Sequence, residues 1–588
     1  MPTEVVKMFD QKKLDEIEKR KKEWKEGPLK GSLERFGVKE SPNKFYTPLD
    51  IKDHDFLEKE GFPGTYPFTA DIYPSAAPGN THLPGSGHLM TGGGLVRAGQ
   101  YSGYGTPEDT RDYYKSEIAR GRRQGPNQAF DLPTQVGYDS NNPLVRGEVG
   151  KVGVAVDTLR DIEVIYEAFV GDMDLDKIAS NWTINGPVNI ILAMYIALAE
   201  KRGIPQEKLR GTPQNDILKE FIARGTYIFP VKPSMRMVRD TVVYCTEYMP
   251  LMNTISICGN HMREQGATAA QTLAFTICNL IAYIQLGVDA GLDVDRFVPR
   301  FSANHLSGSM EFFNEIALQR ATRRLWAKTI KERFGAKNPR TCLYRPSQWA
   351  RQGDYSCTVR RPLNNFTRAI IGGIAGALSG GNPGVVPPYD EPLGLGWSRE
   401  ALQLNEDARR IIQYEAQLCD VIDPLAGSYY VESLTDEIEH EAEAIINHVD
   451  TIGGAVAAIE NGFIQQEIAR SAYEYQKQVE NKERIIVGVN AFTDEHELEV
   501  LTNRLVPYPY DAEKRAQAEE RQIDNLTQVK RNRDNQEVKE TLKRLEEAAK
   551  DEKTNLIPPV LEAVKAYATM GEICDVLRGV FGEYQFSG

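Results

Sequence analysis

Residues 180–201 read SNWTINGPVNIILAMYIALAEK, and this stretch decides the fold class. Its first part, Ser180–Asn185, is a short strand-like run that carries small or polar residues on one face. Its second part, Val188–Lys201, is a long apolar run with the pattern of a helix. A strand followed by a helix is the unit from which α/β proteins are built.

The same alternation recurs between residues 127 and 430. Strand-like runs are found at Gln128–Asp131, Asn253–Cys258 and Arg300–Asn304, and another helical pattern covers Ala269–Leu286. Such βα units, repeated over roughly 300 residues, predict an α/β fold with a (β/α)8 TIM barrel. A doubly wound parallel sheet is the alternative.

The strand-like runs differ from ordinary barrel strands in their side chains. Barrel interiors are usually packed with Val, Ile and Leu. Here one face of each run is small or polar, with Asn181, Thr183, Asn185, Thr254, Ser256, Cys258, Ser302 and Asn304. Either this face points inward and admits a polar ligand, or these side chains pair with loop backbone at the strand ends.

Outside the barrel, the sequence predicts two further regions. Residues 1–60 form an N-terminal helix and an extended arm, and residues 61–430 form the barrel domain, entered through a loop rich in Gly and Pro. Residues 431–588 form a mixed, mostly helical region. It begins with a mixed segment to about residue 510, continues with charged amphipathic helices over 511–553 and ends in one apolar helix over 560–580.

The composition of the chain argues against several classes of function. The chain has 588 residues, 41% hydrophobic and 26% charged, with a formal net charge of -13. An acidic protein of this kind is a poor partner for nucleic acid or for an anionic membrane surface. The N-terminus lacks the apolar segment of a secretory signal, and no apolar run reaches the length of a membrane span. Seven scattered cysteines without a CxxC pair indicate reduced thiols and a cytoplasmic protein.

Four histidines, His261, His440, His448 and His496, lie in contexts that bear on catalysis or metal binding. His261 follows the strand-like run Asn253–Cys258, and the carboxyl end of a barrel strand is where catalytic groups are expected. On spacing alone, a structural histidine is the alternative. His440 and His448 do not make a metalloprotease motif, because Ala444 stands where HExxH needs its second histidine. The run at 494–499 has Glu where a cobalamin-binding DxHxxG motif has Gly. We therefore predict no metal site on this chain.

Several long blocks resemble the methylmalonyl-CoA mutase family. They are FDLPTQVGYDS (130–140), GTPQNDILKEFIARGTYIFPVKPSMR (211–236), NTISICGNHMREQGAT (253–268), VIDPLAGSYYVESLTDEIE (421–439), RIIVGVNAF (484–492) and LIPPVLEAVKAYATMGEICDVLRGVFGEY (556–584). The resemblance covers residues from about 60 to the C-terminus.

The resemblance implies an adenosylcobalamin-dependent acyl-CoA mutase in which the carbonyl-CoA group undergoes a radical 1,2-migration. The expected reaction is the interconversion of methylmalonyl-CoA and succinyl-CoA. Because the similarity ends where single-chain members continue into a cobalamin-binding domain, we expect a large, substrate-binding subunit. A small cobalamin-binding subunit would supply the cobalt ligand, in an α2β2 heterotetramer.

The resemblance also assigns roles to residues that align with the family motifs. Tyr101 and His261 are the expected catalytic residues, Tyr101 lying against substrate and cofactor and His261 bonding the thioester carbonyl. The expected substrate ligands are Arg224 for the free carboxylate, Gln214 and Asn260 near the acyl group, and Arg300, Ser302 and Arg97 for CoA. The expected cofactor contacts are Phe130, Glu264, Glu391 and Gln348.

Arginine at position 224 bears on the substrate, because its planar fork holds a carboxylate through two hydrogen bonds. Relatives that act on monocarboxylic acyl groups typically have Gln there. The chain departs from the family at GSGHLMTGGGLVRAG (85–99), at NPGVVPP (382–388) and at Asn260, where many members have Tyr. The alternatives are therefore a mutase for a bulkier malonyl- or succinyl-CoA, a monocarboxylic acyl-CoA mutase, or a catalytically silent paralogue that binds a partner.

Overall fold

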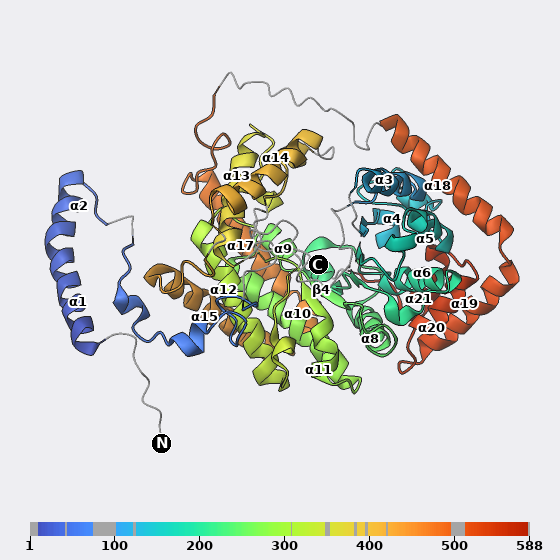
Figure 1. Cartoon of the computed structure of the whole chain (residues 1–588), viewed down its shortest axis with the longest axis horizontal. Coiled ribbons are helices and arrows are strands. Elements are labelled where there is room, and N and C mark those ends of the chain that lie inside the picture. Colours follow the sequence, from blue (N-terminus) through green and yellow to red (C-terminus); the bar gives the residue numbers. More distant parts are fainter. Residues whose placement is uncertain are drawn as a thin grey trace.

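The computed structural model is a mostly helical α/β protein with short parallel strands (Figure 1). It describes ten segments of the chain, residues 10–40, 44–74, 102–121, 125–306, 308–346, 353–380, 385–393, 398–418, 421–494 and 512–585.

Within the described segments, five short strands form the centre of the fold. Strands β1 (Asn127–Ala129), β2 (Ser180–Thr183) and β3 (Gly211–Pro213) make a three-stranded parallel sheet in the order β1-β2-β3. Strands β4 (Ile255–Ile257) and β5 (Phe301–Ala303) make a parallel pair. The backbone N–H of Ser256 donates to Gln214 O at 2.8 Å, so the two sheets adjoin. The described strands thus lie side by side in chain order, as repeated βα units require.

Each strand after β1 is followed by a helix that covers it. These helices are α6 (Val188–Lys201), α8 (Val231–Tyr248), α10 (Ala269–Asp289) and α12 (Phe312–Lys328). The predicted strand positions and the two predicted helical patterns are confirmed. The closed eight-stranded barrel is not established, because the strands of the described segments form sheets of three and two.

Burial alternates with a period of two along β2, β3 and β5, whereas all three residues of β4 are buried. Trp182, Ile184, Ile255 and Ile257 are fully buried, whereas Asn181, Thr183, Thr212 and Ser302 are only half-buried on the other face. Some of these polar groups bond to neighbouring strands: Ser302 Oγ donates to Ile255 O at 3.0 Å. The polar face is therefore partly exposed and partly bonded to the backbone of a neighbouring strand.

Helix α10 is long and apolar enough to cross a membrane by length and composition alone. In the fold it is a core helix, because 72% of its most apolar window is buried inside the protein. It packs against α12 and against α15 (Tyr429–Ile452).

The C-terminal region is more helical than expected. The segment from 429 to 480 is α15, α16 (Ala455–Glu460) and α17 (Phe463–Glu480), where a mixed segment was expected. The amphipathic helices α18 (Ala512–Asn532) and α19 (Asn535–Lys550) are confirmed.

The prediction of a single apolar helix over residues 560–580 is wrong. Two helices stand there, α20 (Ile557–Lys565) and α21 (Met570–Phe581). The break occurs because Tyr567 has a positive φ of 62°, after which Thr569 caps the next helix. Helices α19 to α21 lie beside α6, on the opposite side of the molecule from α13 (Asn364–Leu378) and α17 (Figure 1).

The N-terminal helix is also confirmed. Helix α1 (Gln11–Trp24) runs through one π-helical turn at Lys25–Leu29 into α2 (Lys30–Phe36). It lies at the left of Figure 1, where Lys21 Nζ donates to Thr47 Oγ1 and Asp50 Oδ2, both at 3.2 Å, and so ties α1 to the arm that follows.

A buried carboxyl group near β1 makes stability depend on pH. Asp131 accepts hydrogen bonds from Thr134 N at 3.0 Å and Gly150 N at 2.7 Å, and burial raises its pKa to about 7. Burial also raises the pKa of Asp216 to about 6. An unfolded Asp titrates near pH 3.9, so from about pH 5 to 8 the folded state binds more protons than the unfolded state.

The unfolding free energy is therefore expected to fall as the pH rises from 5.5 to 8. Replacing Asp131 by Asn should make this fall smaller, because the neutral amide does not titrate. Urea titrations of the wild type and the variant at both pH values measure the difference. An equal fall in the two proteins would show that Asp131 is ionised throughout this range.

Candidate functional site

The carboxyl ends of β2, β3 and β4 bring together three of the six substrate ligands expected from the sequence, Gln214, Arg224 and Asn260. Asn185 follows β2, Gln214 follows β3, and the short helix α9 (Asn260–Glu264) follows β4. In a parallel sheet these ends share one edge, which is where α/β enzymes place their sites.

Gln214 is buried and firmly held. Its Oε1 accepts hydrogen bonds from Asn185 Nδ2 at 2.9 Å and from Lys219 Nζ at 2.7 Å. Asn185 Oδ1 in turn accepts from Asp216 N at 2.9 Å. The amide oxygen is thus occupied by the protein, which leaves the amide NH2 of Gln214 as its group for a ligand.

Arg224 ends the π-helical turn Glu220–Arg224, which Gly225 terminates with a φ of 83°. Its side chain is 26% exposed, and Nη1 lies 3.5 Å from Glu220 Oε1. Nη1 has no hydrogen-bond acceptor among the residues that the structure describes. A half-buried guanidinium with such a free donor is suited to an anionic ligand.

Helix α9 carries Asn260, His261 and Glu264. It begins after Gly259, where a Cβ atom would lie 2.5 Å from Leu306 Cγ, so the close packing requires glycine. Gln265 Nε2 donates to Ala223 O at 3.1 Å and ties the end of α9 to the turn that carries Arg224. His261 and Glu264 are half-buried.

Asn260 is almost fully buried, at 5% exposure. Its backbone N–H donates to His305 O at 3.1 Å, which anchors α9 to the segment after β5. Its Oδ1 finds no hydrogen-bond donor within the described segments. A buried polar atom without a protein partner commonly bonds to a water or a ligand.

Arg300 and Ser302 lie away from this edge. Arg300 directly precedes β5 and Arg210 directly precedes β3, so both arginines stand at the amino ends of the strands. Burial, and then the charges of Arg210 and Arg340, lower the pKa of Arg300. Burial, followed by the charge of Arg300, likewise lowers the pKa of Arg345 to about 10.

This arginine cluster, which consists of Arg210, Arg300, Arg340 and Arg345, gathers positive charge that an anionic group would relieve. Of these four arginines, the family motifs pointed only to Arg300. Arg210 could have been found from its position directly before a strand. Because β3 was not predicted, nothing in the sequence placed Arg210 near Arg300.

The remaining predicted residues are placed less clearly. Phe130 is fully buried in the hydrophobic core next to β1, and Glu391 lies half-buried in the turn Glu391–Leu393. Tyr101, Arg97 and Gln348 lie outside the described residues.

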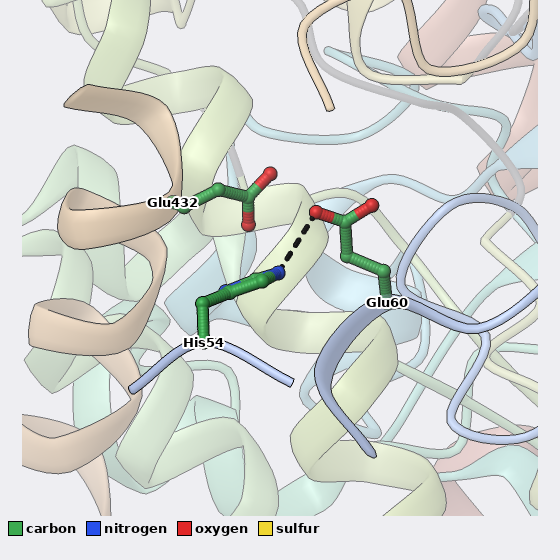
Figure 2. Close-up of side chains that lie close together, drawn as sticks. All are labelled: His54, Glu60 and Glu432. Carbon is green, nitrogen blue, oxygen red and sulfur yellow. Dashed lines mark hydrogen bonds and ion pairs between the residues drawn. The ribbon is translucent and has the colours of Figure 1, made fainter. Parts of the chain in front are cut away.

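One group of side chains in the described part of the chain has the spacing of metal ligands. The ligand atoms of His54, Glu60 and Glu432 lie within 4.8 Å of one another, and all three side chains are buried (Figure 2). His54 Nε2 lies 3.0 Å from Glu60 Oε1.

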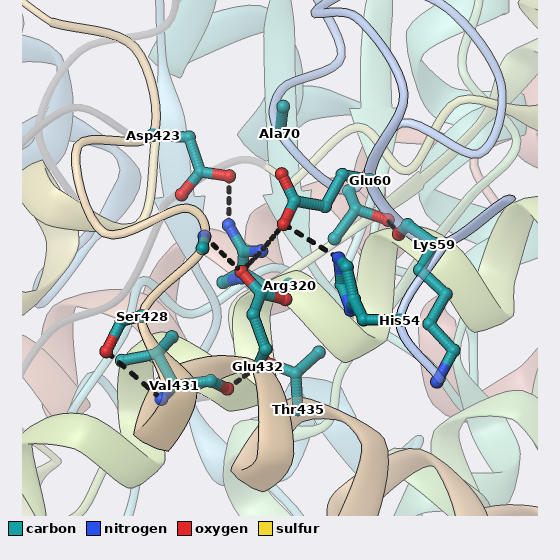
Figure 3. A network of polar contacts seen from close by, with 12 residues as sticks. His54, Lys59, Glu60, Ala70, Arg320, Asp423, Ser428, Val431, Glu432 and Thr435 are labelled. Carbon is teal, nitrogen blue, oxygen red and sulfur yellow. Dashed lines mark hydrogen bonds and ion pairs between the residues drawn. The ribbon is translucent and has the colours of Figure 1, made fainter. Parts of the chain in front are cut away.

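A guanidinium already provides the positive charge in this cluster. Arg320 Nη2 lies 2.5 Å from Glu432 Oε1 and 3.8 Å from Glu60 Oε1, and Nη1 bonds to Asp423 (Figure 3). Burial acts to lower the pKa of Arg320, but the carboxylates of Asp423 and Glu432 raise it overall. We interpret the cluster as an ion-pair network that fastens the arm of residues 44–74 to α12 and α15.

His440 and His448 are exposed on α15, as surface residues should be. The six cysteines in the described segments are free thiols, which agrees with the expected reduced state. Burial raises the pKa of the Cys258 thiol, next to the site, to about 12. A thiol of this kind is a poor nucleophile.

Comparisons with known proteins agree with the resemblance in the sequence. The profile of the family described as methylmalonyl-CoA mutase matches residues 38–583. The 2-hydroxyisobutanoyl-CoA mutase large subunit of Aquincola tertiaricarbonis is 40% identical over 543 residues, which cover 92% of this chain and 90% of that protein.

Two further relatives are methylmalonyl-CoA mutases. The protein of Escherichia coli (strain K12) is 39% identical over 489 residues, or 82% of this chain and 65% of that protein. The mitochondrial protein of Homo sapiens is 37% identical over 540 residues, or 92% of this chain and 68% of that protein. The chain therefore spans about two thirds of the length of these mutases.

Proposed function

We propose, from the premise that this chain belongs to the methylmalonyl-CoA mutase family, that it is the large, acyl-CoA-binding subunit of a mutase. Members of this family are isomerases of the intramolecular transferase class. The reaction we propose is the 1,2-migration of a carbonyl-CoA group that interconverts methylmalonyl-CoA and succinyl-CoA.

The choice of substrate rests on the hydrogen bonding of Arg224. Its guanidinium keeps a donor free at the strand ends, on a turn tied to the helix that carries His261. A carboxylate on the acyl group would take this donor and be held by two parallel hydrogen bonds. A substrate without a carboxylate would leave Nη1 without a hydrogen-bond acceptor, with only the Glu220 carboxylate at 3.5 Å to balance its charge, so a dicarboxylic acyl-CoA fits best.

In the proposed mechanism this chain positions the substrate and excludes water from it. Arg224 fixes the carboxylate, Gln214 donates its amide to an acyl oxygen, and His261 donates to the thioester carbonyl as the CoA-bearing group moves. Tyr101 is proposed to lie against the substrate and the cofactor.

Adenosylcobalamin, when bound, supplies the radical chemistry. One residue of α9 suits a large ring bearing amide groups, because the half-buried carboxylate of Glu264 can accept hydrogen bonds from amide N–H groups. Glu264, Glu391 and Gln348 are the proposed contacts, whereas Phe130, which is fully buried in the core, would act only by supporting them.

The strand face and the arginine cluster suit a CoA ester. We propose that the five parallel strands belong to a (β/α)8 barrel whose half-buried polar face, with Asn181, Thr183 and Ser302, lines the path of the substrate. Arg300 and its neighbours stand at the amino ends of the strands, where they would bind CoA phosphates. Arg97 is a further proposed CoA contact.

A small cobalamin-binding subunit is the proposed partner. The relative from Aquincola tertiaricarbonis is named a large subunit, and this chain covers 90% of it. We propose that the two subunits form an α2β2 heterotetramer in the cytoplasm, with the cobalt ligand on the small subunit.

An assay of several acyl-CoA esters tests the proposed substrate. The protein, isolated through a tag on this chain so that bound subunits stay with it, would be given adenosylcobalamin. Methylmalonyl-CoA, ethylmalonyl-CoA, isobutyryl-CoA and 2-hydroxyisobutyryl-CoA would be compared. A dicarboxylic ester is expected to be preferred, and preference for either monocarboxylic ester would overturn the proposed role of Arg224.

Position 260 is predicted to set the size limit of the acyl group. Asn is much smaller than the Tyr of many relatives, and one extra buried methylene contributes about 0.8 kcal/mol to binding. We expect kcat/KM to hold or rise from methylmalonyl-CoA to ethylmalonyl-CoA.

Replacing Asn260 by Tyr should then lower the ethylmalonyl-to-methylmalonyl ratio of kcat/KM by about tenfold, through steric exclusion. Two results together would contradict this prediction: a wild type that prefers methylmalonyl-CoA more than tenfold, and an Asn260→Tyr variant with the same ratio.

A further inference from the structure

We infer that Lys219 is a positioning residue that acts on both substrate ligands, Gln214 and Arg224. The inference rests on the proposed function, since it concerns how the same site recognises the acid group of its acyl-CoA. Lys219 itself is fully buried, at 0% exposure, and so is not placed to touch the substrate.

The geometry fixes which way the Gln214 amide points. An ammonium group can only donate, and Lys219 Nζ lies 2.7 Å from Gln214, so the facing atom must be the amide oxygen. The second donor is equally determined. Asp216 N–H bonds to Asn185 Oδ1 at 2.9 Å, so the other end of the Asn185 amide is Nδ2, which donates to Gln214.

With both donors in place, a flipped Gln214 would set its NH2 against two other donors. Gln214 is therefore held as a donor toward the ligand, which suits a carboxylate or carbonyl oxygen of the substrate. Without Lys219, one of the two constraints on this orientation is lost.

Lys219 also controls how strongly Arg224 is drawn to the protein. Glu220 is 1% exposed, and its Oε1 lies 2.9 Å from Lys219 Nζ but 3.5 Å from Arg224 Nη1. Burial acts to raise the pKa of Glu220, but Lys219 and then Arg224 hold this pKa below its usual value. Because Lys219 neutralises the buried carboxylate, the charge of Arg224 remains for the substrate.

A purely structural role for Lys219 predicts something different. If the lysine only compensated the buried Glu220, removing both charges together would restore a normal enzyme, as replacing a buried ion pair by neutral groups often does. The Lys219→Met/Glu220→Gln double variant separates the two roles, because it removes the charge conflict but not the loss of the donor to Gln214.

The experiment uses the tagged holoenzyme with adenosylcobalamin and methylmalonyl-CoA. For Lys219→Met we expect KM to rise at least tenfold, because Glu220 then pairs with Arg224. For the double variant we expect KM to return to within about threefold of the wild type while kcat stays at least tenfold lower. Lys201→Met, on a lysine that is 45% exposed and paired with Glu163, is the matched control and should change neither parameter.

Calorimetry with succinyl-CoA and free CoA gives a readout that does not depend on turnover. The wild type is expected to bind succinyl-CoA more tightly than CoA, and Lys219→Met to lose most of this preference. An active wild type whose double variant has normal kcat and KM, whatever the single variant does, would overturn the inference and leave the proposed function intact. A wild type with neither turnover nor a preference for succinyl-CoA would overturn both.

Discussion

Replacing Arg224 by Gln is expected to lower kcat/KM for a dicarboxylic acyl-CoA by about a hundredfold or more. A buried charge that loses its partner costs about 3–5 kcal/mol, and here the uncompensated charge is the carboxylate of the substrate. The free Nη1 donor and the position of Arg224 at the carboxyl ends of the strands support this expectation.

The measurement compares methylmalonyl-CoA with isobutyryl-CoA in the wild type and the variant. The variant should lose activity toward the dicarboxylic ester far more than toward isobutyryl-CoA. Arg160→Gln, on an arginine that is 52% exposed and paired with Glu163, is the control and should change kcat/KM less than twofold. Equal losses for both esters would show that Arg224 supports the fold and not the carboxylate.

Replacing His261 by Ala is expected to lower kcat by about a hundredfold or more, with a smaller change in KM. The reason is that a single oxyanion-type donor is worth about 2.7–4 kcal/mol in the transition state. His261 stands on α9, which Gly259 and the bond from Asn260 N to His305 O hold against the strand ends.

The kcat and KM of the variant for methylmalonyl-CoA test the role of His261. His440→Ala removes an exposed histidine of α15 and should leave both values unchanged. A His261→Ala enzyme of normal kcat would make this histidine a structural residue.

The elements that the sequence predicted well are those with strong apolar patterns. Helix α6 spans the predicted residues Val188–Lys201, because nearly all of them are buried and apolar. Strand β3 was missed, because Gly211–Pro213 has neither β-branched side chains in series nor an alternating pattern. The predicted final helix is two helices, because the backbone of Tyr567 has a positive φ. The apolar pattern of the sequence does not reveal this conformation.

The candidate site was predicted in part for a similar reason. Motif similarity located Arg224, Gln214 and His261. In the structure, the elements that bear these residues lie together at the carboxyl ends of the strands. Lys219 was not singled out, because a lysine in a sequence is ordinarily a surface residue. Only its complete burial and its contacts with Gln214 and Glu220 reveal its part in the site. The ion-pair network at Arg320 depends likewise on residues far apart in the chain.

The central claim, that this chain provides the substrate site of an acyl-CoA mutase, is tested most directly by following isomerisation itself. The protein isolated through a tag on this chain would be incubated with methylmalonyl-CoA, with and without adenosylcobalamin, and the thioesters separated by chromatography. Succinyl-CoA is expected to form only when adenosylcobalamin is present, and the Arg224→Gln enzyme should form at least a hundredfold less. If no dicarboxylic acyl-CoA is isomerised by a preparation that contains bound cobalamin and its partner subunit, the claim is contradicted.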